Sequence, residues 1–432
     1  MNKSLKTFLS YVIPSMVAML IVGSYSIVDT IFIGQATGET GLAAVAITWP
    51  IVLLFGAFGD MLGTGAAVLI SQERGKKNFQ KAKFLFGNML LMQLVLSLIL
   101  WAIFVPNTKS LLFLFGATPE LIPMAMDYVM VLVWANLLFM LGVGLGAIVR
   151  NDGRPILAMF LMILGLGLNI ILDYIFIFVL DGGVKGAALA TVVSLAVGIL
   201  VTLGYFLTPW THVRITKGMF KIKPEYMKQI AVTGIPSLGN QLSIIAMLFL
   251  HNFQSMRYGG VSGLAAYTFI GAIESMGSLL LTGLALGIQP LVAFFNGAKN
   301  YVQQRIMGNM GYATAFGLGV ILMAVSLLGC DIFPTWFNLT GETAVLAAHG
   351  LVLSSTAFLL LGVVRVAGYY YQSTGKIIYS SILIYGDAFA ALPLCLFILP
   401  IFCGLDGVWL SMPVSRLLLF LLALYFWYGK RK

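Results

Sequence analysis

Long apolar stretches dominate the sequence, and short segments rich in charged residues, glycine and proline separate them. A helix needs about 20 consecutive apolar residues to cross a hydrocarbon core about 30 Å thick. Read this way, the pattern predicts twelve membrane-spanning helices. Their expected limits are residues 8–34, 43–70, 84–105, 121–146, 156–180, 187–208, 230–256, 263–295, 309–332, 343–371, 380–402 and 408–429.

The composition supports a membrane protein and excludes several other classes. Of the 432 residues, 60% are hydrophobic and only 9% are charged, and the mean hydropathy is +0.99. A soluble domain has about 25% charged residues, and disordered chains are also poor in apolar residues. We therefore predict an all-α polytopic membrane protein.

The distribution of positive charge predicts the orientation in the membrane. The termini and alternate loops hold 20 of the Lys and Arg residues, whereas the opposite loops hold only Lys109, Lys185 and Arg257. Cytoplasmic loops carry the excess of Lys and Arg, so both termini are expected in the cytoplasm. The net charge of +10 is thereby explained by topology, and we expect no nucleic-acid partner.

The two halves of the chain resemble each other when the numbering is shifted by 222 residues, here called the repeat shift. This shift places Ile13-Pro14-Ser15 on Ile235-Pro236-Ser237. Under the same shift Gly153 falls on Gly375. Further pairs are Gly41 to Ala44 with Gly263 to Ala266, and Gly75, Lys77 and Asn78 with Gly297, Lys299 and Asn300. Six spans per repeat predict two six-helix lobes about a pseudo-twofold axis along the membrane normal, as in transporters. We assign residues 1–208 to the N-terminal lobe, 209–229 to a cytoplasmic linker on anionic lipid, and 230–432 to the C-terminal lobe.

Acidic residues within the predicted spans are candidates for function, because a charged side chain in hydrocarbon is costly. Asp29 and Asp173 precede the outer ends of their helices by five and seven residues. At 1.5 Å per residue both lie roughly 7–11 Å below the outer boundary. Asn169 lies one turn from Asp173 on the same helix face, and Thr191 lies near the start of the next helix.

These four residues are expected to share one layer of the N-terminal lobe. Two carboxylates held together away from water cannot both ionise cheaply, so the pair is suited to binding and releasing a proton. The same oxygens, with those of Asn169 and Thr191, are suited to Na⁺. The alternative is a set of hydrogen-bonded packing residues with no part in transport.

The other charged residues within spans have less defined roles. Glu274 is a candidate substrate or secondary charge site, with structural pairing as the alternative, and we group Tyr25 and Arg365 with it. Asp60 and Asp387 are expected to be structural, and Arg365 and Arg416 to pair with such acids or to reach an interface. His251 takes the position of Asp29 in the second repeat and is interpreted as an interfacial residue.

No catalytic arrangement emerges. The sequence has no Walker loop, so ATP is not expected to drive transport directly, and no nucleophile–base pair or metal cluster suggests an enzyme embedded in the membrane. We expect no cofactor besides the coupling ion. A flippase for lipid-linked sugars is an alternative function, but its cavity would need many Arg and Lys, and only Arg365 and Arg416 lie within spans.

The motifs resemble those of the multidrug and toxic compound extrusion (MATE) family over essentially the full length. They are Val28 to Gly34, Gly41 to Ala44, Asn169 to Asp173 and Gly183 to Thr191, in that order. The resemblance implies two six-helix lobes that export small cationic or amphipathic drugs in exchange for H⁺ or Na⁺. It further implies a monomer in the bacterial inner membrane.

The resemblance is closer to the DinF-like branch of that family than to the NorM-like branch. Asp29, Asn169, Asp173 and Thr191 match by position the cation-site residues of the DinF-like branch. The NorM-like branch carries an acidic residue in helix 7, and residues 236–256 contain none. The resemblance therefore favours ion coupling in the first lobe.

Overall fold

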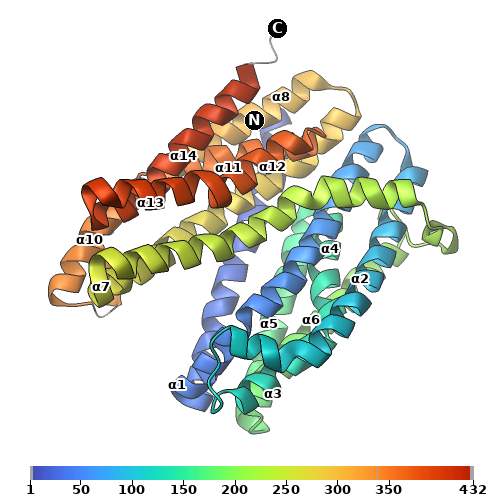
Figure 1. The fold of residues 1–432 in the computed structure, drawn as a ribbon. Helices are drawn as coiled ribbons and strands as arrows, with labels where there is room; N and C mark the ends of the chain where they lie inside the picture. The colour runs from blue at the N-terminus through green and yellow to red at the C-terminus, as the bar shows by residue number, and fades with distance from the viewer. Residues whose placement is uncertain (1–2, 338, 429–432) are drawn as a thin grey trace. The chain divides into compact units, whose positions relative to one another are not determined.

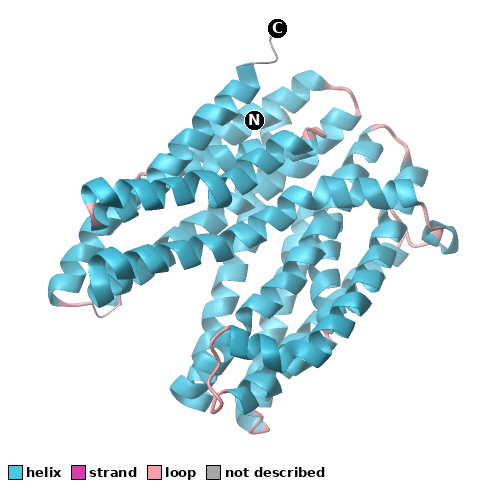
Figure 2. Ribbon diagram, viewed as in Figure 1, coloured by secondary structure: helices cyan, strands magenta, loops and turns pink. Residues whose placement is uncertain are grey.

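The computed structural model describes residues 3–337 and 339–428 (Figure 1). In that part of the chain every regular element is a helix, joined to the next by a short loop (Figure 2). Eight helices are long and apolar enough to cross a membrane, and two bent helix pairs, α3 with α4 and α10 with α11, bring the number to ten. The all-α membrane prediction is confirmed.

Helices α1 (Lys3–Gly75) and α7 (Pro224–Gly297) each account for two spans, which makes twelve in total. At 1.5 Å per residue an unbroken helix of this many residues would be roughly 110 Å long, far more than one membrane crossing needs. Gly38 interrupts α1 with φ 64° and ψ −159°, and Gly260 interrupts α7 with φ 58° and ψ −152°. Glycine is the residue that adopts this backbone without strain.

The remaining helices follow the predicted spans. The first half continues with α2 (Phe79–Leu114), α3 (Ile122–Trp134), α4 (Asn136–Asn151), α5 (Pro155–Asp173), the π-helical turn η1 (Tyr174–Val179) and α6 (Gly183–Leu207). A 3₁₀ turn, η2 (Lys217–Phe220), precedes α7. The second half continues with α8 (Tyr301–Gly329), α9 (Phe333–Trp336), α10 (Gly341–Ser355), α11 (Phe358–Ser373), α12 (Ile377–Gly386), the π-helical turn η3 (Asp387–Ala391), α13 (Leu392–Cys403) and α14 (Leu405–Tyr428).

The backbone confirms the repeat. The repeat shift relates Gly38 to Gly260, and it also relates Lys77 to Lys299, which have φ of 59° and 56°. The asparagine after each lysine caps the next helix: Asn78 accepts from the Lys81 amide, and its repeat mate accepts from the Gln303 amide, both at 3.1 Å. The two repeats therefore have the same backbone geometry and the same helix cap in this loop.

The chain divides into two compact units. Unit 1 comprises the chain up to Met16, Gly239–Val292 and the residues from Asn300 onward. Unit 2 comprises Val17–Leu238 and Ala293–Lys299. This division differs from the predicted lobes because the first helix of each repeat begins against the other repeat. In unit 1 a Cβ on Gly287 would lie 2.7 Å from the Val12 Cα, and in unit 2 a Cβ on Gly234 would collide with the Met61 carbonyl oxygen.

A contact between repeat-related positions lies within unit 2, where α1 and α7 end. A Cβ on Gly75 would collide with the carbonyl oxygen of Phe294, and a Cβ on Gly297 would collide with that of Gln72. The repeat shift relates the two glycines to each other, and it relates the two carbonyls in the same way. The two helix ends therefore meet backbone to backbone, with no room for a side chain between them.

The linker between α6 and α7 packs on α2, and its predicted position on anionic lipid stays a prediction. The Asn88 side-chain amide of α2 donates to the Lys221 carbonyl at 3.0 Å, and its oxygen accepts from the Lys223 amide at 2.9 Å. Met219 of η2 is buried. These contacts place the linker within unit 2.

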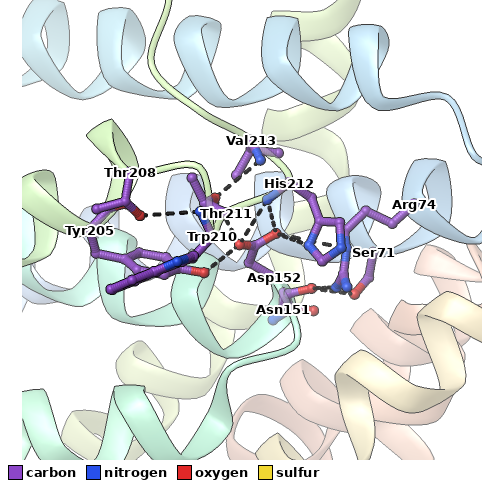
Figure 3. A network of polar contacts seen from close by, with 10 residues as sticks. All are labelled: Ser71, Arg74, Asn151, Asp152, Tyr205, Thr208, Trp210, Thr211, His212 and Val213. Carbon is purple, nitrogen blue, oxygen red and sulfur yellow. Dashed lines mark hydrogen bonds and ion pairs between the residues drawn. The ribbon is translucent and has the colours of Figure 1, made fainter.

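A buried carboxylate fixes the start of the linker (Figure 3). Asp152, at the end of α4, is fully buried and accepts hydrogen bonds from the Tyr205 hydroxyl at 2.6 Å and the Thr211 hydroxyl at 2.8 Å. The His212 amide also donates to it at 3.2 Å, and Arg74 Nε lies 3.8 Å away. Sequence reasoning missed this residue, because its Asp-Gly position reads as an ordinary turn.

Candidate functional site

The four residues predicted to form the cation site are all buried within unit 2. Asp29 lies on α1 before the Gly38 break, Asn169 and Asp173 lie in the last turns of α5, and Thr191 lies on α6. Their relative exposures are 8%, 1%, 0% and 7%, so none is a surface residue. Asp173 is the last residue of α5, and η1 begins directly after it.

The two carboxylates interact electrostatically. Asp29 and Asp173 are close enough to repel each other when both are ionised. One oxygen of Asp29 and both oxygens of Asp173 are buried without a hydrogen-bond donor. Buried polar groups are normally paired, so binding of a proton or a cation would stabilise these oxygens.

Asn169 and Thr191, the other two predicted site residues, are also buried in unit 2. The Asn169 side-chain nitrogen is buried without an acceptor, and the Thr191 hydroxyl donates to the Ala187 carbonyl at 3.1 Å. Among the ion pairs of the described residues, none joins Asp29 or Asp173 to an arginine or lysine. Carboxylate, amide and hydroxyl oxygens suit H⁺ or a hard cation.

The second repeat has a different arrangement. Unit 1 contains a cavity of about 420 Å³ whose lining includes Glu274, Arg365 and Arg416. A smaller space of about 40 Å³ shares both arginines and adds Asp387. Arg416 forms an ion pair with Asp387, which confirms the prediction that an arginine pairs with a membrane acid. Sequence analysis grouped Glu274 with Arg365, and both do line one cavity.

Other predicted residues have structural surroundings. The Thr64 hydroxyl donates to Asp60 at 2.6 Å on the same helix. His251 was expected at an interface, but it is 1% exposed and its ring stacks on Tyr267 at 4.9 Å. That expectation is wrong because the packed helices of unit 1 enclose His251. The side chain of Tyr25 lies outside the described residues.

A family profile matches both repeats. The MatE profile covers residues 14–175 and again residues 236–397, and the repeat shift carries the first match onto the second. Together they cover more than half of the chain, and each begins in the first span of its repeat and extends into the fifth.

Relatives match over nearly the full length. The chain is 27% identical over 431 residues to the multidrug export protein MepA of Staphylococcus haemolyticus strain JCSC1435, covering 99% of this chain and 94% of that protein. It is 26% identical over 424 residues to MepA of Staphylococcus aureus strain MSSA476, covering 97% and 92%. Both relatives are named as export proteins.

Solved structures share the fold. A structure described as the outward-facing conformation of a multidrug resistance MATE family transporter matches with a TM-score of 0.93 and 25% identity, over 100% of this chain and 96% of that chain. A MATE structure in a bent conformation matches with a TM-score of 0.92 and 25% identity, with the same coverage. The chain therefore belongs to the MatE family of multi-pass membrane transporters, the multidrug and toxic compound extrusion family that its motifs resemble.

Proposed function

We propose that this protein is a secondary active multidrug exporter that exchanges small cationic or amphipathic drugs for H⁺ or Na⁺ by alternating access. One observation carries the ion coupling: Asp29 and Asp173 are buried together, repel each other, and have oxygens without donors. The names of the relatives support the export of drugs. The bacterial relatives support a location in the plasma membrane, and the distribution of Lys and Arg supports cytoplasmic termini.

The coupling follows from competition for negative charge. When Asp29 and Asp173 are ionised, the site attracts a cation, and a bound proton or Na⁺ removes that attraction. Drug and coupling ion then weaken each other's binding by the same factor, as thermodynamic linkage requires. Asn169 and Thr191 contribute oxygens that position the ion. The exchange needs no cofactor, and a single chain carries the whole site.

Efflux from vesicles tests this proposal. Ethidium efflux would be measured with an imposed pH gradient and, separately, with an imposed Na⁺ gradient. The wild type is expected to respond to one of the two gradients, and Asp29→Asn and Asp173→Asn are expected to abolish the response while the protein still folds. The exposed Asp127 of α3 provides the control Asp127→Asn, which should transport normally. Normal coupled export by Asp29→Asn would exclude the mechanism.

The lipid-linked sugar flippase finds less support. A pyrophosphate cargo would need several cationic groups in one chamber. The 420 Å³ cavity is lined by two arginines, and one of them already pairs with Asp387.

A further inference from the structure

The cavity in unit 1 has the size and the walls of a small-molecule site. Its volume of about 420 Å³ lies in the usual range for ligand pockets, roughly 300–1,000 Å³. Helices α7, α10, α11 and α14 contribute to its lining. The apolar part of the wall includes Ile244, Met247, Leu248, Phe358, Leu361 and Met412.

On the acidic side, Glu274 forms no ion pair, although the positive charge of Arg416, which lines the same cavity, acts on it. Its Oε1 is buried and accepts no hydrogen bond. No lysine, arginine or histidine among the described residues lies within ion-pair distance of it. The nearby Arg416 is already engaged, because it pairs with Asp387 outside this cavity.

On the basic side, Arg365 has hydrogen bonds but no anionic partner. One of its terminal nitrogens donates to the Ser278 carbonyl at 3.0 Å and to the Thr282 hydroxyl, both on α7. A guanidinium has five donors, so further donors remain for a ligand. Within residues 3–337 and 339–428 no carboxylate forms an ion pair with it.

Opposite charges therefore face one cavity without neutralising each other. Glu274 and Arg365 are too far apart for an ion pair, yet both line the cavity. A buried charge without a counter-charge is unfavourable, and a charge-assisted hydrogen bond to each would relieve that cost. A ligand with a single positive group would serve Glu274 and leave Arg365 unpaired, whereas a single negative group would do the reverse.

We propose that this cavity binds a small zwitterionic amphiphile, with its ammonium group at Glu274, its carboxylate at Arg365 and its apolar body against the wall between them. The inference rests on the proposed export function only in taking the bound ligand to be a substrate. Binding itself is expected to require neither Asp29 nor Asp173, because neither residue lines this cavity.

Three fluorescent probes with one common body test this proposal. Nα-dansyl-lysine carries both charges, its methyl ester keeps only the ammonium, and Nα-dansyl-Nε-acetyl-lysine keeps only the carboxylate. Dissociation constants would be measured by dansyl fluorescence on the purified full chain in detergent, without an ion gradient. The zwitterion is expected to bind about tenfold or more tightly than either single-charge probe.

Variants then assign each charge. Arg365→Gln should remove the preference for the acid over the ester, and Arg365→Lys should keep part of it. Glu274→Gln should remove the preference for the free amine over the acetylated probe and leave the acid–ester preference intact. Ser275→Ala changes an uncharged residue of the same wall and should preserve both preferences. A ratio of dissociation constants is independent of the fraction of protein that is folded.

The outcomes separate this inference from ion coupling. Asp29→Asn protein should bind Nα-dansyl-lysine as the wild type does, even though its coupled efflux is lost. If the ester binds as tightly as the acid in the wild type, or if neither Glu274→Gln nor Arg365→Gln changes a preference, the inference is wrong. Either result would leave the coupling role of Asp29 and Asp173 unaffected.

Discussion

Arg416 of α14 forms an ion pair with Asp387, the first residue of the π-helical turn η3. In the fifth span of the first repeat, Asp173 directly precedes η1, although the repeat shift does not relate Asp173 to Asp387. There the neighbouring charge is a second acid, Asp29. Each repeat thus places an acid beside a π turn, a feature often found at functional sites, but among the described residues an ion pair with a cation is formed only by the acid of the second repeat.

Removing that cation should destabilise unit 1. Arg416 is 1% exposed, so Arg416→Met would leave Asp387 without its counter-charge in the protein interior. Breaking a buried pair by removing one partner costs about 3–5 kcal/mol. The double variant Arg416→Met/Asp387→Asn should be clearly more stable than the single variant. Thermal unfolding in detergent would measure both, and equal stability of the single and double variants would contradict an energetically coupled pair.

Binding of a monovalent cationic drug should weaken as pH falls. Protonation of Asp29 or Asp173 removes the negative charge that attracts the cation, so affinity is highest when both are ionised. Titration calorimetry across neutral and mildly acidic pH would measure the effect on the wild type. The Asp29→Asn/Asp173→Asn variant should give a nearly flat profile, and Asp127→Asn should keep the wild-type slope. An unchanged slope in the double variant would place the titrating group elsewhere.

Adding a methyl group at Gly234 should separate two helix segments of unit 2. Its Cβ would collide with the Met61 carbonyl oxygen, and overpacking of this kind costs about 1–3 kcal/mol. Gly198 of α6 is the matched control, because a Cβ there meets nothing within 4 Å. Gly198→Ala should be neutral or stabilising by up to about 1 kcal/mol. Thermal unfolding of the two alanine variants should therefore shift in opposite directions or differ clearly in size.

Loss of Asp152 should release the linker. Asp152→Ala leaves the hydroxyls of Tyr205 and Thr211 and the amide of His212 without their acceptor, and each unpaired buried donor costs about 1–3 kcal/mol. Limited trypsin digestion should then cut faster after the exposed Arg214. Asp152→Asn keeps one acceptor oxygen and should have a smaller effect. The exposed Asp331 gives the control Asp331→Ala, and equal digestion rates for all variants would argue against an anchoring role.

The sequence was sufficient to predict the helical fold and the repeat. Apolar length determines where a helix crosses a membrane, so the spans emerge from hydropathy alone. The repeat shift predicted pairs that the backbone confirms, such as Lys77 with Lys299 and Gly153 with Gly375. The breaks at Ala135 and between α10 and α11 were not predicted, because no proline or charge marks them.

The surroundings of single side chains were harder to predict. In a soluble helix polar residues identify the exposed face, but here lipid-facing and buried faces are both apolar. Sequence analysis could therefore place Asp29 and Asp173 at one depth, but it could not place Arg416 beside Asp387 or His251 against Tyr267. The burial of Asp29, Asn169, Asp173 and Thr191 is now established, whereas their role in coupling remains a prediction.

The contact between the helix ends at Gly75 and Gly297 has a consequence for how the sequences of the two halves can differ. Equivalent positions that touch each other make the kind of isologous interface found in a homodimer with twofold symmetry. In a homodimer, any mutation appears on both sides at once. In a single chain, the ancestral symmetry constrains only the contact itself, and each half accumulates changes alone. One half can then carry Asp29 and Asp173 as an acidic pair while the other carries Arg416 as the counter-charge of Asp387.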